Sequence, residues 1–157
     1  MHVYQARDGH VAIHGPAGAW IACAPLAAAF PAWRQVIPSD TIHTATVSGD
    51  ALAKALAPHV AAVKGAPVNP ATRLHVNGRL AISTTTDGGS AASECECAHA
   101  GPDVEASYSA RLLASVVNCA GGGTLTLRWT ADVMFQPLMV EGDDGVRAVL
   151  MPMRPSP

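Results

Sequence analysis

Short apolar stretches separated by turn-forming residues fill the first part of the chain. Residues 3–6 and 11–13 flank Asp8-Gly9, a dipeptide that favours a tight hairpin turn because both residues tolerate positive φ. A second turn, over residues 15–18, precedes a third apolar stretch at residues 20–24. The pattern predicts a three-stranded meander, which is too small for a core of its own and presents unpaired edges.

A proline-bounded segment follows the meander. Residues 30–38 read Phe-Pro-Ala-Trp-Arg-Gln-Val-Ile-Pro. Proline lacks a backbone N–H and restricts the residue before it, so prolines near both ends disfavour a helix. The segment is therefore predicted to be an extended linker.

From residue 41 the pattern changes to a strand, a helix and three strands. The first strand is predicted at residues 44–47, and Ser48 is the predicted N-cap of a helix over residues 50–64. One face of that helix is apolar and carries Leu52, Leu56, Val60 and Val63. Pro58 lies inside it and is expected to kink it. The three following strands are predicted at residues 73–76, 79–85 and 92–98.

The same order of elements then occurs a second time. A strand at residues 104–108 and a helix at residues 109–119 are followed by three further strands, predicted at residues 124–129, 134–140 and 146–151. The two copies share element order more than sequence. A duplicated unit of this kind predicts an α+β fold with two helices on one face of a mostly antiparallel sheet.

Composition and charge narrow the classes of function. The 157 residues carry 10 Lys and Arg against 12 Asp and Glu, a formal net charge of −2, which excludes a binder that works by bulk positive charge. No apolar run approaches the roughly 20 residues of a membrane span, and the first residues do not follow a signal-peptide pattern. We therefore expect a cytoplasmic protein with reduced thiols and no membrane association.

The residues do not predict an enzyme or a cofactor. They form no paired-carboxylate motif, nucleophile elbow or phosphate loop. The triple glycine at residues 121–123 follows a helix and precedes a strand, the reverse of the order in a phosphate-binding loop, so a helix C-cap and turn are expected. Six histidines are interpreted as surface or half-buried residues rather than catalytic ones: His2, His10, His14, His43, His59 and His75.

One spacing is compatible with a metal site. On a strand, Cys95, Cys97 and His99 would share a face and could offer three ligands. A structural zinc takes four ligands, and the sequence supplies no second pair, so no metal is expected. The alternative is that the two cysteines are buried as small apolar residues.

Two stretches carry a resemblance to a known family. Residues 141–154, Glu-Gly-Asp-Asp-Gly-Val-Arg-Ala-Val-Leu-Met-Pro-Met-Arg, resemble the C-terminus of the bacterial β sliding clamp, the processivity subunit of DNA polymerase III. Residues 30–38 resemble the segment that joins the second and third clamp domains, and residues 50–56, Asp-Ala-Leu-Ala-Lys-Ala-Leu, fall where the third domain would place them. The resemblance implies the sliding-clamp domain fold, and it implies that Cys95 and Cys97 face the core while Glu94 and Glu96 face solvent.

The resemblance also implies a domain organisation. Residues 40–157 would be a complete C-terminal clamp domain, and residues 1–39 would be a three-strand remnant of the preceding domain plus the linker. A clamp chain has three similar domains, and two chains close a ring around duplex DNA. Met1 is either the natural start of a shortened homologue or the boundary of a fragment, and the sequence leaves both open.

For partner binding, the resemblance implies an apolar cleft that accepts short peptides. The residues that match its positions are Pro31, Gln35, Val36, Phe135, Pro137, Val149, Met151, Pro152, Met153 and Arg154. Gln35 replaces the usual arginine of the family, and Tyr108 and Arg111 fall where an asparagine and a tyrosine commonly line the cleft. Alternatively, Met151 and Met153 are core residues of the last strand, in step with Val149.

For DNA binding, cations on the helix surfaces opposite the apolar stripe are the candidates. They are Lys54 and Lys64 on the first helix and Arg111 on the second, and Arg73 could add to them from the strand that follows the first helix. Such residues would contact phosphates without reading bases, which gives sequence-independent, salt-sensitive binding to double-stranded DNA. The alternative is that these cations only make the helix face soluble and, at the C-terminal end of a helix, stabilise it by interacting with the helix dipole.

Two functions follow as expectations. The first is a non-enzymatic sliding-clamp-like processivity factor, or a shortened homologue of one, which forms a homo-oligomer and tethers a DNA polymerase or repair protein through its clamp-binding peptide. The second is a truncated, clamp-derived modulator that binds partners and does not encircle DNA.

Overall fold

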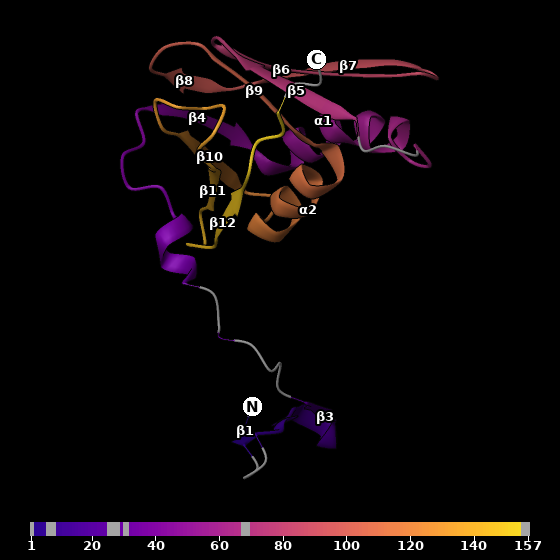
Figure 1. Ribbon diagram of the computed structural model, residues 1–157, viewed down its shortest axis with the longest axis vertical. Coiled ribbons are helices and arrows are strands. Elements are labelled where there is room, and N and C mark those ends of the chain that lie inside the picture. The colour runs from indigo at the N-terminus through magenta and orange to yellow at the C-terminus, as the bar shows by residue number, and fades with distance from the viewer. Residues whose placement is uncertain (1, 6–8, 25–28, 30–31, 67–69, 155–157) are drawn as a thin grey trace. The chain divides into compact units, whose positions relative to one another are not determined.

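The computed structural model describes residues 2–5, 9–24, 29, 32–66 and 70–154 (Figure 1). The chain divides into two compact units, Met1–Ala32 and Trp33–Pro157. The boundary lies inside the proline-bounded segment, so the residues from Trp33 onward pack with the second unit.

The first unit is the predicted meander. Strands β1 (His2–Gln5), β2 (Val11–His14) and β3 (Trp20–Cys23) pair antiparallel in the order β1-β2-β3. Gly9 has a φ of 86°, which a hairpin turn requires, and a short 3-10 turn η1 (Pro16–Gly18) joins β2 to β3. Every residue of β1 and β3 is exposed. Asp8 and Ala6 lie outside the described residues.

The proline-bounded segment is not wholly extended, and here the prediction is wrong. Residues Trp33–Val36 form a 3-10 helix, η2, and the Arg34 guanidinium stacks over the Trp33 ring at 4.4 Å from its centroid. The four residues of η2 contain no proline, so their backbone N–H groups are free to form the short turn. Pro31 lies outside the described residues.

The second unit contains two antiparallel sheets rather than the single sheet expected from the sequence. One has five strands in the order β12-β11-β10-β4-β8 and the other has four in the order β7-β6-β5-β9. The bounds of the five-stranded sheet are β4 (His43–Ser48), β8 (Ala98–Ala100), β10 (Thr124–Trp129), β11 (Leu138–Gly142) and β12 (Arg147–Leu150). Those of the four-stranded sheet are β5 (Ala71–Val76), β6 (Arg79–Thr86), β7 (Gly89–Glu96) and β9 (Val104–Ser109).

Each helix begins directly after a strand. Helix α1 (Gly49–Ala62) follows β4, and the Ser48 hydroxyl accepts a hydrogen bond from Ala51 N, which confirms the predicted N-cap. Helix α2 (Ala110–Ala120) follows β9 in the same way, with Ser109 as its N-cap rather than as its first helical residue. The duplicated strand–helix–strands order is confirmed, and the fold is the predicted α+β class.

Most predicted strands agree with the observed bounds to within two residues, and two differ by more. The run at residues 92–98 is split at Cys97, because β7 ends in one sheet and β8 pairs with β4 in the other. The strand expected from residue 134 begins only at Leu138, because the amides of Phe135 and Gln136 both donate to Asp132 O and form a turn.

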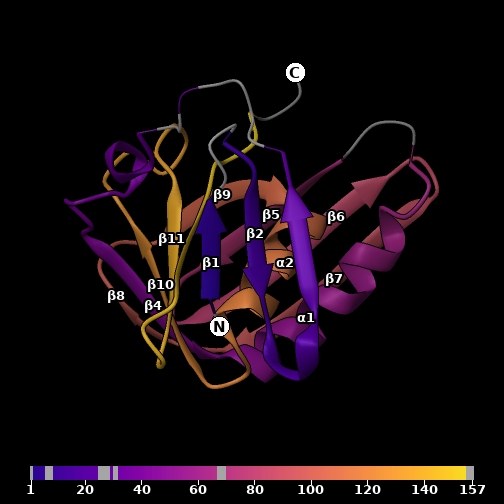
Figure 2. The same cartoon turned by 90° about the horizontal axis from the view of Figure 1, so that it is seen from below.

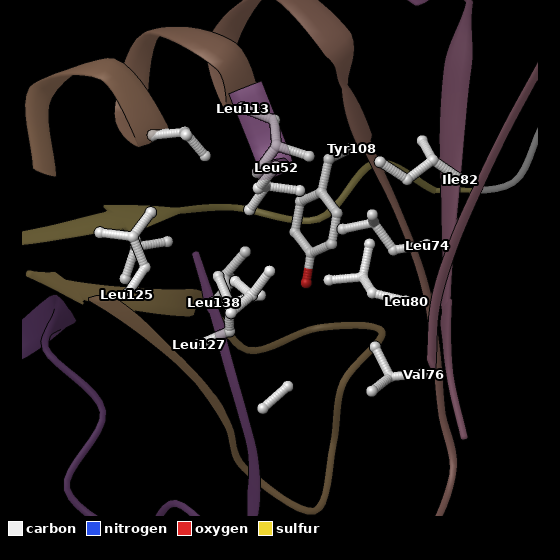
Figure 3. Packing of buried hydrophobic residues seen from close by; sticks show 14 of the residues in the cluster. Leu52, Leu74, Val76, Leu80, Ile82, Tyr108, Leu113, Leu125, Leu127 and Leu138 are labelled. Carbon is white, nitrogen blue, oxygen red and sulfur yellow. The ribbon is translucent and has the colours of Figure 1, made fainter. Parts of the chain in front are cut away.

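The core lies between the helices and the two sheets. The helices pack side by side, α1 mainly against β7 and α2 mainly against β12 (Figures 1 and 2). Leucines from both sheets and both helices surround the Tyr108 ring, as Figure 3 shows. The core is aliphatic except for Tyr108 and Trp129, as the composition leads one to expect.

A turn of three glycines between α2 and β10, in the second copy of the repeat, is hydrogen-bonded to the first copy. Gly121, with a φ of 96°, ends α2 as the predicted C-cap. Asp50 N then donates to Gly122 O at 3.2 Å, and Gly49 N donates to Gly123 O at 2.7 Å. The end of α2 is thereby fixed to the beginning of α1.

Candidate functional site

An apolar groove lies in the second unit, beside η2. It has a volume of about 510 Å³ and is formed by the segment from Gln35 to Asp40, the loop from Thr130 to Pro137, and Met151. Ile42 N donates to Trp129 O at 2.9 Å, which holds the first segment against the loop. Elements that are far apart in the sequence thus form one surface.

Three apolar side chains of the groove lining are largely exposed to solvent. Phe135 is 62% exposed, Met151 is 54% exposed and Val36 is 49% exposed. The turn at residues 132–136 places Phe135 outward, whereas Leu138, two residues after the turn, enters the core. A cluster of exposed apolar residues of this kind often marks an interaction surface, whereas single exposed apolar residues are common on any protein.

The groove gathers part of the set of residues that the family resemblance implies. Gln35, Val36, Phe135, Pro137 and Met151 line it. Four others lie outside its lining: Val149, Pro152, Met153 and Arg154. Pro31 lies outside the described residues.

The alternative interpretation, that Met151 and Met153 are core residues of the last strand, does not hold for Met151. Leu150 is buried, whereas Val149 and Met151 on either side of it are exposed, so Met151 is not a core residue. After β12 the chain crosses to the other sheet, where Met153 N donates to Ser107 O at 2.7 Å. Met153 is half-buried there.

Tyr108 cannot line a cleft, because its side chain is wholly buried. Its hydroxyl accepts a hydrogen bond from Trp129 Nε1 at 3.0 Å, and burial raises the pKa of the phenol. Where an asparagine commonly lines the cleft in the family, this chain therefore has a core residue.

The groove carries negative charge only. Among its lining residues the ionisable ones are Asp40 and Asp132, both exposed. Arg34 stacks on Trp33 and is not part of the lining, and neither is Arg154.

Two of the predicted DNA-contacting cations lie together between the helices. Lys64 and Arg111 line a shallow groove of about 400 Å³ whose walls are mainly small side chains of α1 and α2. The Arg111 Nη2 group donates to Val63 O at 2.6 Å, so Arg111 also caps the end of α1. Lys54 is exposed on α1 but lines a different groove, together with Glu94 and Glu96.

Arg73, the candidate from the strand that follows the first helix, does not lie with the other three. It lies on β5 between the buried residues Thr72 and Leu74, so it points to the opposite face of the sheet from the core. There it forms an exposed ion pair with Glu105 at 3.3 Å.

Two histidines are buried, contrary to the interpretation from the sequence. His43 donates from Nδ1 to Pro102 O at 3.0 Å. His59 contacts the Thr84 hydroxyl through Nδ1 and the Ser93 hydroxyl through Nε2, both at 2.8 Å. His59 is three residues after Leu56 and seven after Leu52, so its helical spacing places it on the buried face and could have identified it.

When the His59 ring is neutral, the hydrogen bonds around it fix which ring nitrogen carries the proton. Ser93 Oγ donates its only proton to Ala55 O at 2.8 Å, so it must accept from His59 Nε2–H. His59 Nδ1 then accepts from Thr84, which in turn accepts from Thr72 at 2.8 Å. Burial lowers the pKa of His59 and favours the neutral ring. Because Ser93 donates its proton to the backbone carbonyl of Ala55, His59 cannot accept that proton as a catalytic base would, and we interpret the network as structural.

The cysteines pack as the resemblance implies. Cys95 and Cys97 are half-buried against the core, whereas Glu94 and Glu96 are exposed. Burial, and to a lesser extent the neighbouring Cys97, raises the pKa of Cys95 to about 11, so its thiol stays protonated at neutral pH. Within the described parts of the chain, no three His, Cys, Asp or Glu side chains are grouped as metal ligands would be.

Two helices packed against each other and against antiparallel sheets, in a duplicated order, define the DNA sliding-clamp fold. The particular resemblance is to the bacterial β sliding clamp. The clamp of Caulobacter crescentus is 28% identical and superposes with a TM-score of 0.78 over 93% of this chain and 39% of that chain.

Other clamps give the same fold. The Pseudomonas aeruginosa clamp, at 18% identity, has a TM-score of 0.80 over 98% of this chain and 41% of that one. The Thermotoga maritima DNA polymerase III β subunit, also at 18% identity, has a TM-score of 0.77 with the same coverage. The chain thus spans about two fifths of the clamps that it matches, which confirms a resemblance to part of a clamp.

No protein-family model and no curated protein sequence matches the chain. Among the described residues, no helix has the length and apolar character needed to cross a membrane.

Proposed function

We propose that this chain is a non-enzymatic, clamp-type processivity factor, or a shortened homologue of one, which acts in the cytoplasm. It holds a DNA polymerase or repair protein through a peptide in the groove beside η2. In this proposal residues 40–157 are the C-terminal clamp domain, and residues 1–39 are the end of the preceding domain with its linker. The observation that carries the proposal is the groove itself, which collects Gln35, Val36, Phe135, Pro137 and Met151.

The chemistry of the groove supports a peptide ligand. Methionine and proline side chains form an adaptable apolar surface that accepts more than one short motif. The Caulobacter crescentus clamp, which is 28% identical, has polyethylene glycol bound at its putative beta-motif tethering region. A bound apolar segment in the groove of this chain would cover the exposed Phe135 and Met151 side chains.

Contact with DNA is the second part of the proposal. Lys64 and Arg111 present positive charge between the two helices, and Lys54 adds a third cation on α1. Cations on helix surfaces contact phosphates without selecting a sequence. Closure around DNA requires further domains, and β7, at the end of the four-stranded sheet, presents an edge suited to such assembly.

A second candidate is a clamp-derived modulator that binds partner peptides and does not encircle DNA. The positions of the cations favour it, because Arg73 pairs with Glu105 on the face of its sheet that points away from the core. Of the four candidate cations, Lys54, Lys64 and Arg111 are then left at the helix surface, which is little positive charge for holding DNA. The groove does not depend on them.

Light scattering of the full chain at low and high concentration, with and without a clamp-binding polymerase peptide, tests the two candidates. A closed oligomer that is retained on circular but not on linear DNA supports the processivity factor. A monomer or simple dimer that binds the peptide supports the modulator. If the peptide binds no better than a version with its apolar anchors replaced by alanine, the groove has been assigned wrongly.

A further inference from the structure

The two aspartates of the groove are not used by the fold. Asp40 and Asp132 make no side-chain hydrogen bond or ion pair within the described residues, and both are exposed. Some other acidic side chains, in contrast, have structural partners. Glu94 pairs with Arg79, Glu141 pairs with Arg128 and Arg147, and Asp143 accepts from Thr124 N. The charge of Asp40 and Asp132 is therefore available to a ligand.

The two carboxylates come from different walls of the groove. Asp40 ends the segment that follows η2, whereas Asp132 accepts the turn hydrogen bonds of Phe135 and Gln136 through its backbone carbonyl, which anchors the loop that carries it. With no basic residue in the lining, they set the sign of the potential at the mouth of an apolar groove. Low-dielectric walls strengthen such a field, and a ligand of opposite charge is drawn to it.

From this arrangement we infer that the groove selects an extended peptide in which a lysine or arginine lies next to the apolar anchor residues. The inference rests on the proposed function, because it names the chemistry of the partner for the same groove. The apolar side chains of the peptide pack against Phe135, Val36 and Met151, and its cation lies between Asp40 and Asp132. An acidic residue at that peptide position is repelled by both carboxylates.

Size and chemistry fit a short peptide better than a compact ligand. A volume of about 510 Å³ holds a few side chains, and the groove is open to solvent along exposed apolar residues. Gln35, Gln136 and Ser39 add polar groups that can bond the backbone of an extended segment. Apolar anchors supply affinity, and the two aspartates supply the discrimination among motifs.

The test uses the full chain and short fluorescein-labelled peptides with the same Leu and Phe anchors, flanked by Lys, Gln or Glu. Fluorescence anisotropy gives the dissociation constants. The Lys peptide is expected to bind about 3-fold more tightly than the Gln peptide, and the Glu peptide about 3-fold more weakly. This preference shrinks between about 50 mM and about 300 mM salt, because exposed charges are screened.

Variants assign the preference to the groove. Asp40→Asn and Asp132→Asn each reduce the Lys-to-Glu ratio, and the double variant abolishes it while the Gln peptide still binds. Asp87→Asn removes an equal exposed charge in the turn between β6 and β7, outside the groove, and leaves the ratio unchanged. If the three peptides bind the unaltered chain equally, the inference is wrong and the proposed function stands. If none binds, the proposed function of the groove is itself wrong.

Discussion

Trp129 Nε1 donates a hydrogen bond to the Tyr108 hydroxyl at 3.0 Å, and both side chains are wholly buried. Trp129 ends β10 in the five-stranded sheet, whereas Tyr108 lies on β9 in the four-stranded sheet. The bond therefore joins the two sheets across the core, where Figure 3 shows the Tyr108 ring among leucines. It is a polar contact among aliphatic side chains, and it pairs the buried indole N–H of Trp129.

Replacing Tyr108 by phenylalanine removes the acceptor and keeps the ring. The buried Trp129 N–H is then unpaired, and the free energy of unfolding is expected to fall by about 1–3 kcal/mol. Urea denaturation followed by circular dichroism measures the loss. Tyr4→Phe is the matched control, because Tyr4 is exposed on β1 and its ring contact with Trp20 survives the change. An equal loss in both variants would show that the buried hydrogen bond is not the cause.

The network around His59 makes the stability of the second unit depend on pH. Burial lowers the pKa of His59 in the folded chain below the usual 6.5. Below about pH 6.5 the unfolded chain therefore binds more protons at this residue than the folded chain does. The resulting stabilisation is complete above pH 6.5 and is lost as the pH falls from 6.5 toward the folded-state pKa. In that window the unfolding free energy falls by at most about 1.4 kcal/mol per pH unit for this one proton.

Denaturation curves between about pH 7.5 and pH 5 measure this slope. His59→Gln removes the titration, so its slope is expected to be shallower than that of the unaltered chain, although its stability at neutral pH is also lower. His75→Gln, which changes a half-buried histidine outside the network, is expected to keep the full slope. If both variants keep it, other groups cause the acid sensitivity.

Much of the fold could be predicted from the sequence because the local signals agree with the tertiary structure. Ser48 follows a strand and precedes an apolar helical stripe, and it caps α1 as expected. The break at Cys97 could not be predicted in this way, because alternation continues through residues 92–98. Only the pairing of Ala98 with Thr46 in the other sheet separates β8 from β7.

The site was predictable to a smaller extent. Phe135 and Met151 could be selected from the family resemblance, and both line the groove. Asp40 and Asp132 could not, since the fold alone brings these two distant segments together. The outward position of Arg73 could have been found, because it alternates with Leu74 on β5 and Leu74 is an obvious core residue.

Gly142 tests the junction between α2 and β11. A Cβ atom at this position would overlap the backbone carbonyl oxygen of Ala120, the last residue of α2. Because a backbone atom cannot move aside cheaply, Gly142→Ala is expected to lower the unfolding free energy by about 1–3 kcal/mol. Gly88→Ala is the control, since the nearest atom to its added Cβ, Thr86 Oγ1, is 3.8 Å away. Equal melting temperatures for the two variants would contradict the close approach.

Replacing Phe135 is expected to weaken peptide binding without destabilising the fold. Its side chain is largely exposed, so Phe135→Ala is expected to change the unfolding free energy by no more than about 0.5 kcal/mol. The same change removes an aromatic anchor of the groove and is expected to weaken the Gln-flanked peptide by about 5-fold or more. Leu112→Ala removes an exposed apolar side chain on α2, outside the groove, and should leave peptide affinity unchanged. Equal weakening by both would indicate a general effect of surface hydrophobicity.

Lys64 and Arg73 test which face of the second unit meets DNA. Lys64 lies between the helices, whereas Arg73 lies on the outer face of the four-stranded sheet, so a phosphate backbone along the helices can contact only Lys64. Lys64→Gln is expected to weaken binding to a duplex of arbitrary sequence and to reduce the slope of log affinity against log salt by about 0.9, the value for one phosphate contact. Arg73→Gln removes the same charge and should change neither quantity, because Arg73 is also paired with Glu105.

Fluorescence anisotropy of a labelled duplex across a salt series gives both slopes. A loss with Arg73→Gln and none with Lys64→Gln would place DNA on the sheet face and exclude a clamp-like arrangement, whereas no binding by any form of the chain would leave the partner-binding modulator as the function.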